Sequence, residues 1–273
     1  MNFIKLESAI RDKKSFLCIG LDPDLKRIPE HLLKYDDPVF EFNKIIIDAT
    51  MDYCVAYKPN LAFYEKLGPK GLVSLEKTLK YIPEHFFKIA DAKRSDIFNS
   101  ASMYADTFYD HFDFDAVTIS PYMGVDAVKP FLRKNKCAII LLATSNSGAS
   151  AVQNISTSSG QPLYLELITE ISKWGSENNI MFVVGASRTD EMLEIRRKAP
   201  NHFFLVPGIG AQGGDMKLVC KNGLNKNIGL LVNVSRAIIY ASSGHDFEKK
   251  VSSTTVEIQK EMQLLLEEYK ILQ

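Results

Sequence analysis

The sequence predicts an α/β protein that folds as one closed (β/α)₈ (TIM) barrel. Short apolar runs rich in β-branched residues alternate with amphipathic segments, and eight such pairs fit within 273 residues. Strands without polar alternation are typical of a parallel sheet that helices cover on both faces. Eight units in about 250 residues favour a closed barrel, with an open doubly wound sheet as the alternative. No linker is evident, so we expect a single domain over residues 1–273.

The predicted strands are apolar runs of four to seven residues, and several end at proline, glycine or a polar turn residue. The third differs from the others because it runs directly into a cluster of charged residues. The eight strands are expected at residues 16–21, 55–59, 86–91, 116–120, 137–143, 180–185, 203–206 and 229–234.

The intervening segments place apolar residues at helical spacing. Pro162 suits the first position of one of these helices. Residues 144–160 are rich in Ser, Gly, Ala and Asn, too polar for the core. Helices are expected at residues 39–52, 72–81, 97–112, 125–132, 163–174, 189–198, 215–221 and 247–271.

Composition excludes several functional classes. Thirty-three basic residues balance thirty-three acidic ones, which gives no support for nucleic-acid or membrane binding. The four cysteines are far apart and form no CxxC pair, which argues against a zinc site and a disulfide framework. The N-terminus lacks a signal-peptide core, and no apolar run approaches the ~20 residues that cross a bilayer. We therefore expect a cytoplasmic protein.

Polar residues follow most of the predicted strands. The active site of a barrel of this kind lies at the carboxyl ends of its strands. Each residue alone has an ordinary explanation as a turn former, a rim charge or loop filler. Gathered at one rim, they predict a shared site. They are Asp22, Lys58, Asp91, Lys93, Asp96, Ser145, Asn233 and Arg236.

The end of the third strand predicts the chemistry. Side chains alternate across a strand, so Asp91 and Lys93 are expected on one face. Lys93 lies between Asp91 and Asp96, and Lys58 supplies a second cation that keeps the carboxylates ionised. Such an array places a proton donor in a preorganised field, which suits a reaction in which an anion departs and carbon is protonated. The structural alternative is a surface ion cluster.

The seventh strand runs into a glycine-rich segment, residues 207–215, that indicates a phosphate site. Gly210 and Gly213 let backbone amides approach an anion, and the helix predicted at 215–221 offers its positive end. Gln212 and Arg236 add side-chain donors. The alternative is a tight turn without a ligand. Because no metal-ligand cluster, nicotinamide fingerprint or pyridoxal pocket is evident, we infer catalysis without a cofactor.

An Asp-x-Lys-x-x-Asp motif at residues 91–96 combines with the segments 57–65, 144–146 and 207–215. Together they resemble the orotidine 5′-phosphate decarboxylase family, in its longer bacterial branch, over essentially the whole chain. The resemblance implies decarboxylation of orotidine 5′-monophosphate to uridine 5′-monophosphate without a cofactor. This is the last step of de novo pyrimidine nucleotide biosynthesis.

The resemblance also implies a role for each site residue. Lys93 would protonate C6 of the pyrimidine as carbon dioxide leaves, and Asp91 would lie against the substrate carboxylate. Lys58 would bridge Asp91 and the ribose. The remaining contacts to substrate would be made by Asp22 (ribose hydroxyls), Ser145 (pyrimidine edge), and Gln212, Arg236, Gly210 and Gly213 (phosphate).

Two residues are implied to act across an interface. Asp96 would reach the ribose bound by a neighbouring subunit, which makes the enzyme a homodimer with composite sites. Ser100, where the family usually has threonine, would keep a hydroxyl for the same ribose. Ser95 stands where the longer branch often has glycine.

Two other functions are compatible with parts of the pattern. Relatives with the same motif use Mg²⁺ to decarboxylate a sugar-phosphate β-keto acid or to condense formaldehyde with a pentulose phosphate (hexulose-phosphate synthase). Lys58 argues against them, because a cation there would repel the metal. A barrel that only senses a nucleotide would not need the costly charge array.

Overall fold

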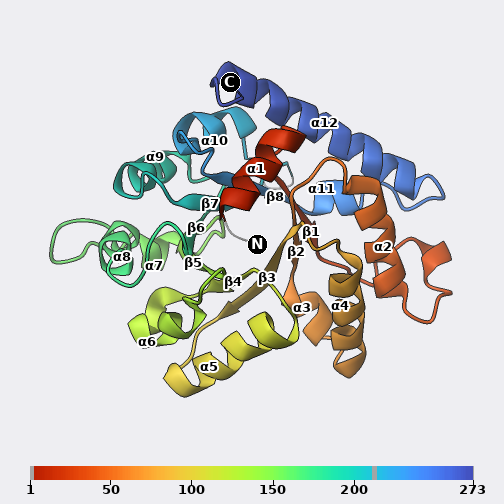
Figure 1. Ribbon diagram of the computed structural model, residues 1–273, viewed down its shortest axis with the longest axis horizontal. Helices are drawn as coiled ribbons and strands as arrows, with labels where there is room; N and C mark the ends of the chain where they lie inside the picture. The colour runs from red at the N-terminus through yellow and green to blue at the C-terminus, as the bar shows by residue number, and fades with distance from the viewer. Residues whose placement is uncertain (1–2, 211–213, 273) are drawn as a thin grey trace.

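The computed structural model describes residues 3–210 and 214–272. Eight parallel strands form a closed barrel in chain order, and the first pairs with the last (Figure 1). The predicted barrel is confirmed, and the open doubly wound sheet is wrong. The strands are β1 Leu17–Leu21, β2 Ala56–Pro59, β3 Phe87–Arg94, β4 Ala116–Ile119, β5 Cys137–Ala143, β6 Ile180–Val184, β7 Phe203–Pro207 and β8 Leu230–Val234.

Helices surround the barrel (Figure 1). Each of the eight predicted helical segments contains one, although the segments 97–112 and 125–132 finish in a π turn and a 3₁₀ turn. The larger helices are α2 Pro38–Thr50, α4 Pro69–Tyr81, α5 Phe98–Asp106, α8 Leu163–Ile171, α9 Thr189–Lys198, α10 Met216–Gly223 and α12 Phe247–Glu268. Shorter ones are α3 Leu61–Glu65, α6 Val125–Val128, α7 Ser150–Gln153 and α11 Arg236–Ile239.

Helix α1, Phe3–Lys13, was not predicted. It lies over the amino-terminal end of the barrel, where the Phe3 ring stacks on Phe203 with a centroid distance of 5.3 Å. Leu6 and Ile10 are buried beneath it. The i, i+3, i+7 spacing of these three apolar residues was the signal that could have revealed the helix. Since α1 covers the amino-terminal end, the carboxyl end is left for a site.

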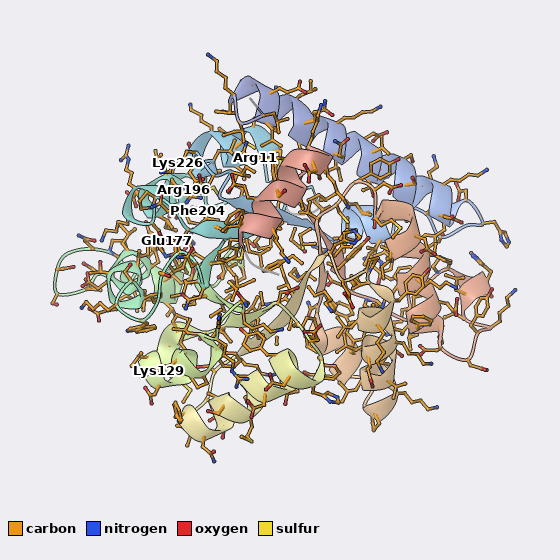
Figure 2. All side chains as sticks on the ribbon, viewed as in Figure 1. Arg11, Lys129, Glu177, Arg196, Phe204 and Lys226 are labelled. Carbon is orange, nitrogen blue, oxygen red and sulfur yellow. The ribbon has the colours of Figure 1, made fainter. Side chains whose placement is uncertain are left out.

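Arg196 on α9 fastens the amino-terminal ends of β7 and β8 together. Its guanidinium donates hydrogen bonds to the carbonyl oxygens of His202, Gly223 and Gly229. It also stacks on the Phe204 ring, 3.6 Å from the centroid (Figure 2). Burial lowers the pKa of Arg196 to about 9. No carboxylate of the described residues forms an ion pair with this buried cation, and the carbonyl oxygens compensate its charge instead.

The four cysteines are all buried and unpaired, in agreement with the sequence prediction of no disulfide framework. Across residues 3–210 and 214–272, no helix combines the length and the hydropathy that a membrane span requires.

Candidate active site

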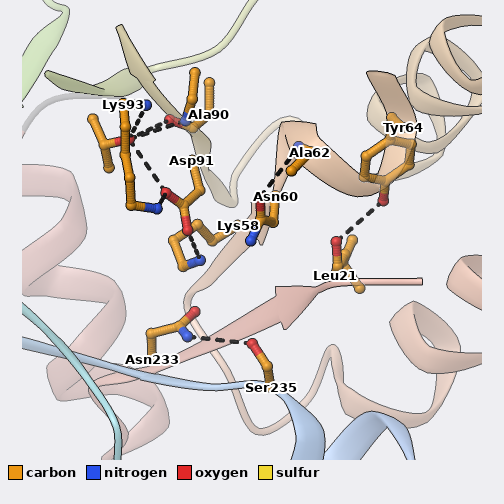
Figure 3. Close-up of polar contacts among 12 residues, drawn as sticks. Leu21, Lys58, Asn60, Ala62, Tyr64, Ala90, Asp91, Lys93, Asn233 and Ser235 are labelled. Atoms are coloured by element: carbon orange, nitrogen blue, oxygen red, sulfur yellow. Dashed lines mark hydrogen bonds and ion pairs between the residues drawn. The ribbon is translucent and has the colours of Figure 1, made fainter. Parts of the chain in front are cut away.

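Two lysines converge on one carboxylate at the carboxyl ends of β2 and β3. Lys58 Nζ donates to Asp91 Oδ2 at 2.6 Å, and Lys93 Nζ donates to Asp91 Oδ1 at 2.5 Å (Figure 3). The Lys58 side chain is 5 % exposed, whereas the Lys93 side chain is 53 % exposed. The structure thus brings together three of the predicted residues, with the buried lysine beneath the carboxylate and the accessible one at the mouth.

Each member of the buried pair is held in its charged form. Burial lowers the pKa of Lys58, but the attraction of Asp91 and Asp22 outweighs it, and the pKa stands above its ordinary value. Burial raises the pKa of Asp91, but Lys58 and Lys93 outweigh it, and the pKa falls well below its ordinary value. The pair is therefore ionised at neutral pH, a fixed field beside the Lys93 ammonium.

The sequence predicted that strand β3 ends at Asp91, but the strand continues to Arg94. Its pairing with β4 shifts from Ala90↔Val117 to Arg94↔Ile119, so three residues of β3 stand opposite one residue of β4. Lys93 has φ 47°, in the left-handed region. Simple alternation therefore does not describe this stretch, and the bulge is part of how Lys93 reaches Asp91.

The ends of β1 and β8 leave acceptors without donors. Among the described residues, neither Asp22 Oδ1 nor Asn233 Oδ1 has a hydrogen-bond partner, although both atoms are buried. Asn233 Nδ2 donates to Ser235 Oγ at 3.3 Å (Figure 3). A Cβ on Gly20 would lie 1.7 Å from Ser235 Oγ, so glycine is required for this close approach. Burial raises the pKa of Asp22, and the nearby positive charge of Lys58 partly offsets this rise.

Ser145 follows β5 and packs against Gly185 at the end of β6. A Cβ on Gly185 would come within 2.9 Å of the Ser145 Cβ. Gln153 on α7 fixes the preceding residue, because its Oε1 accepts from the Thr144 amide at 3.0 Å and its Nε2 donates to Thr144 Oγ1 at 2.8 Å. Neither Gly185 nor Gln153 was among the site residues predicted from the sequence. Glycine directly after an apolar strand was the one available signal.

The predicted phosphate cradle is only partly described. Gly208 and Gly210 adopt φ 107° and 75°, as a glycine turn requires. A Cβ on Gly210 would lie 3.7 Å from the Ala237 Cβ, which puts this turn beside exposed Arg236 at the start of α11. Gln212 and Gly213 lie outside the described residues.

The expectation that the helix after the glycines offers its positive end is wrong. Asp215 caps α10, and its Oδ1 accepts from the amides of Lys217 and Leu218. A carboxylate therefore already occupies the amide donors that an anion would use. The sequence contained this signal, since aspartate before a helix is a common cap.

Asp96 and Ser100 lie outside the Lys58–Asp91–Lys93 contacts of their own chain. The Asp96 carboxylate accepts from the Ile97 amide at 2.7 Å. It forms no ion pair with any side chain that the structure describes. Ser100 lies in the first turn of α5 and is half-buried.

Comparison with known proteins places the chain in a family. Residues 15–246 match the family described as "Orotidine 5'-phosphate decarboxylase / HUMPS family". The chain belongs to this family. An orotidine 5′-phosphate decarboxylase of Flavobacterium johnsoniae is 53 % identical over 262 residues, which cover 94 % of this chain and 96 % of the relative. One of Parabacteroides distasonis is 52 % identical over 266 residues, covering 96 % and 95 %.

Solved structures of the decarboxylase family agree with this assignment. The Leishmania donovani OMP decarboxylase superposes with a TM-score of 0.84 at 32 % identity, covering 97 % of this chain and 98 % of that one. The Leishmania donovani UMP synthase gives a TM-score of 0.86 at 34 % identity, and this chain spans 56 % of its length. These comparisons confirm the resemblance inferred from the sequence.

Proposed function

We propose that this protein is an orotidine 5′-phosphate decarboxylase that converts orotidine 5′-monophosphate to uridine 5′-monophosphate and carbon dioxide. It would act in the cytoplasm, as the last step of de novo pyrimidine nucleotide biosynthesis. The observation that carries the proposal is the contact of Lys58 and Lys93 with the two oxygens of Asp91. Relatives that share about half of its residues carry the same name.

The charge array accounts for each change in bonding. The bond between C6 and the carboxylate breaks, carbon dioxide departs, and the electron pair stays on C6. The Lys93 ammonium gives C6 a proton and becomes an amine, which regains a proton from solvent through its exposed side. Asp91 would lie against the substrate carboxylate, where its charge would disfavour the bound carboxylate more than the departing neutral molecule.

Substrate contacts follow from the remaining residues. The unpartnered Asp22 Oδ1 is suited to accept from a ribose hydroxyl, and Lys58 reaches the same region through Asp91. Ser145 would bond the pyrimidine edge. Arg236, with Gln212 and the backbone at Gly210 and Gly213, would hold the phosphate. Phosphate binding far from C6 supplies energy that orients the base.

A second copy of the chain would complete the site. Asp96 is followed by a group of exposed large apolar side chains on the segments after β3 and β4, an arrangement that favours burial against another protein surface. Asp96 and Ser100 would then contact the ribose bound by the partner. The apolar side chains are those of Ile97, Phe98, Met103, Tyr122 and Met123.

The contacts of Asp91 also favour this proposal over the chemistry of the Mg²⁺-dependent members of the family. Both oxygens of Asp91 already accept from ammonium groups. A divalent cation bound there would have to displace one of them and would be repelled by the other. We therefore assign the decarboxylation of orotidine 5′-monophosphate, without a metal, rather than chemistry through a metal-bound enediolate.

The deciding experiment follows orotidine 5′-monophosphate by its ultraviolet absorbance, with chromatographic identification of uridine 5′-monophosphate. We expect turnover by the purified protein with no cofactor added, at the same rate after treatment with EDTA. Complete loss in EDTA that Mg²⁺ restores would instead support the metal-dependent relatives. Binding of the nucleotide without any turnover would support a sensor.

A further inference from the structure

Thr118 in β4 is a buried polar side chain that none of the roles above uses. It is 2 % exposed. Its Oγ1 accepts from the amides of Ala92 at 3.0 Å and Lys93 at 2.9 Å. Its proton faces two acceptors, Asp91 Oδ1 at 3.3 Å and, at the longer distance of 3.5 Å, the Ala90 carbonyl oxygen. A hydroxyl has one donor and two acceptor sites, so the two amides and one of the two oxygens, of which Asp91 Oδ1 is the nearer, use its full capacity.

The contacts replace what the bulge removes. Residues 91, 92 and 93 of β3 stand opposite Thr118 alone, so the regular ladder of the two strands cannot pair their backbone groups. Thr118 supplies an acceptor to two of these amides. Without it, the amides of Ala92 and Lys93 would lose this acceptor, and an amide left without an acceptor destabilises the conformation that leaves it so.

Lys93 also needs an external constraint. Its φ of 47° lies in the left-handed region, which is unfavourable for a residue other than glycine. Such a conformation persists only where the surroundings fix it. The hydrogen bond from the Lys93 amide to Thr118 Oγ1 fixes the backbone in this way. The same hydroxyl also contacts the Asp91 carboxylate, which accepts a hydrogen bond from the Lys93 ammonium.

We propose that Thr118 is a positioning residue that holds Lys93 in its left-handed conformation and orients Asp91, so that ammonium and carboxylate meet at the barrel mouth. As far as it concerns turnover, the inference rests on the proposed function. It deepens that function by adding a residue on a neighbouring strand that does not touch the substrate.

The test removes the hydroxyl while keeping the shape. In Thr118→Val we expect kcat for orotidine 5′-monophosphate to fall roughly 10- to 100-fold, because small misplacements of a reacting group cost about that much. The affinity for uridine 5′-monophosphate, measured by calorimetry, should change little, since the phosphate and ribose contacts are untouched. Thr118→Ser restores the hydroxyl and should recover most of kcat. Thr118→Ala is a second hydroxyl-free variant with the same expectation.

Thr78→Val is the matched control. Thr78 is fully buried in α4, donates to the Ser74 carbonyl and accepts from Asn43, and lies outside the proposed site. The Thr78→Val substitution should lower the melting temperature without changing kcat. The inference is overturned if Thr118→Val lowers only the melting temperature, as the control does, or if Thr118→Ser is as impaired as Thr118→Val.

A readout independent of turnover separates this inference from the proposed function. Acetic anhydride labels exposed lysine amines, and peptide mass spectrometry compares Lys93 with exposed Lys134. Release of Lys93 from Asp91 should raise its relative labelling several-fold in Thr118→Val but not in Thr118→Ser. If the wild-type protein fails to decarboxylate yet labelling follows this pattern, the proposed function fails and the positioning role stands. Unchanged labelling overturns the positioning role.

Discussion

Asp91 differs from an ordinary rim carboxylate because both of its oxygens accept from lysine ammonium groups. The motif 91–96 and Lys58 were visible in the sequence, and the prediction that Lys58, Asp91 and Lys93 meet agrees with the structure. The bulge that brings Lys93 there was not predictable by alternation. It depends on Thr118, which belongs to the next strand and carries no local signal for such a role.

Lys93→Ala tests the proton donor. We expect kcat to fall by about 10²–10⁴-fold or more, the usual contribution of a positioned acid, with uridine 5′-monophosphate binding largely retained. Stopped assays at high enzyme concentration measure the remaining rate.

Lys88→Ala is the control on the same strand. Lys88 pairs with Asp113 at 3.3 Å at the opposite end of β3, so its removal should lower stability and leave kcat unchanged. Equal activity of wild type and Lys93→Ala would contradict the assignment of the donor.

At the scale of elements, the strands were predictable, whereas the carboxyl end of β3, the helix caps and the loop anchors were less so. Apolar runs locate the strands because a buried parallel sheet tolerates little else. The short helix α7 was missed because its sequence resembles a polar loop, and its function as an anchor depends on Gln153 meeting Thr144. Asp215 differs from Gln153 because it lay within the predicted phosphate segment. Its role as the cap of α10 was not predicted.

Gln153→Ala tests that anchor. Loss of both hydrogen bonds should loosen Thr144 and thereby Ser145, which would raise KM for orotidine 5′-monophosphate by about 5- to 30-fold if roughly 1–2 kcal/mol of orientation is lost. Gln161→Ala is the control in the same segment, since Gln161 bonds the Lys198 ammonium rather than Thr144. Steady-state kinetics of the two variants should differ in KM.

His202 makes the connection between α9 and β7 sensitive to acid. Neither ring nitrogen has a partner among the described residues, and the side chain packs 5.0 Å from the Phe182 ring. Burial lowers the pKa of His202, the nearby Glu177 opposes the shift, and the Arg196 guanidinium adds to it. The folded pKa thus lies below the unfolded value of about 6.5. The neutral His202 ring therefore makes its full contribution to the free energy of unfolding above pH 6.5. That contribution is lost as the pH falls through the folded pKa.

His202→Leu cannot be protonated and should escape this loss. We expect the free energy of unfolding of wild type to fall relative to that of His202→Leu between pH 7 and pH 5, as urea titrations would measure. His85→Leu, at an exposed histidine, should track wild type. Parallel pH curves for wild type and His202→Leu would show that the ring is accommodated as a cation.

At the scale of the whole molecule, the barrel was predictable because eight repeats of one pattern leave few topologies. The assembly is a different matter, since a single sequence does not say which exposed apolar residues meet a partner. Sedimentation equilibrium should give a dimer, and an active monomer at assay concentration would refute composite sites.

Mixing two inactive variants tests the shared site directly. Asp96→Ala and Lys93→Ala chains, each impaired alone, should together recover up to about a quarter of wild-type activity. Random pairing makes half of the dimers mixed, and each of these has one intact site. Mixtures no more active than either parent would place Asp96 outside the neighbouring site.

The bare acceptors at Asp22 and Asn233 have a consequence for the free enzyme. A buried oxygen without a hydrogen-bond donor lowers the free energy of unfolding, and the packing of the rest of the barrel has to offset that loss. The hydroxyl groups of a bound nucleotide would donate hydrogen bonds to these oxygens and remove that loss. Binding would therefore stabilise the folded state, and the cell's supply of pyrimidine nucleotide would itself help to keep the protein folded.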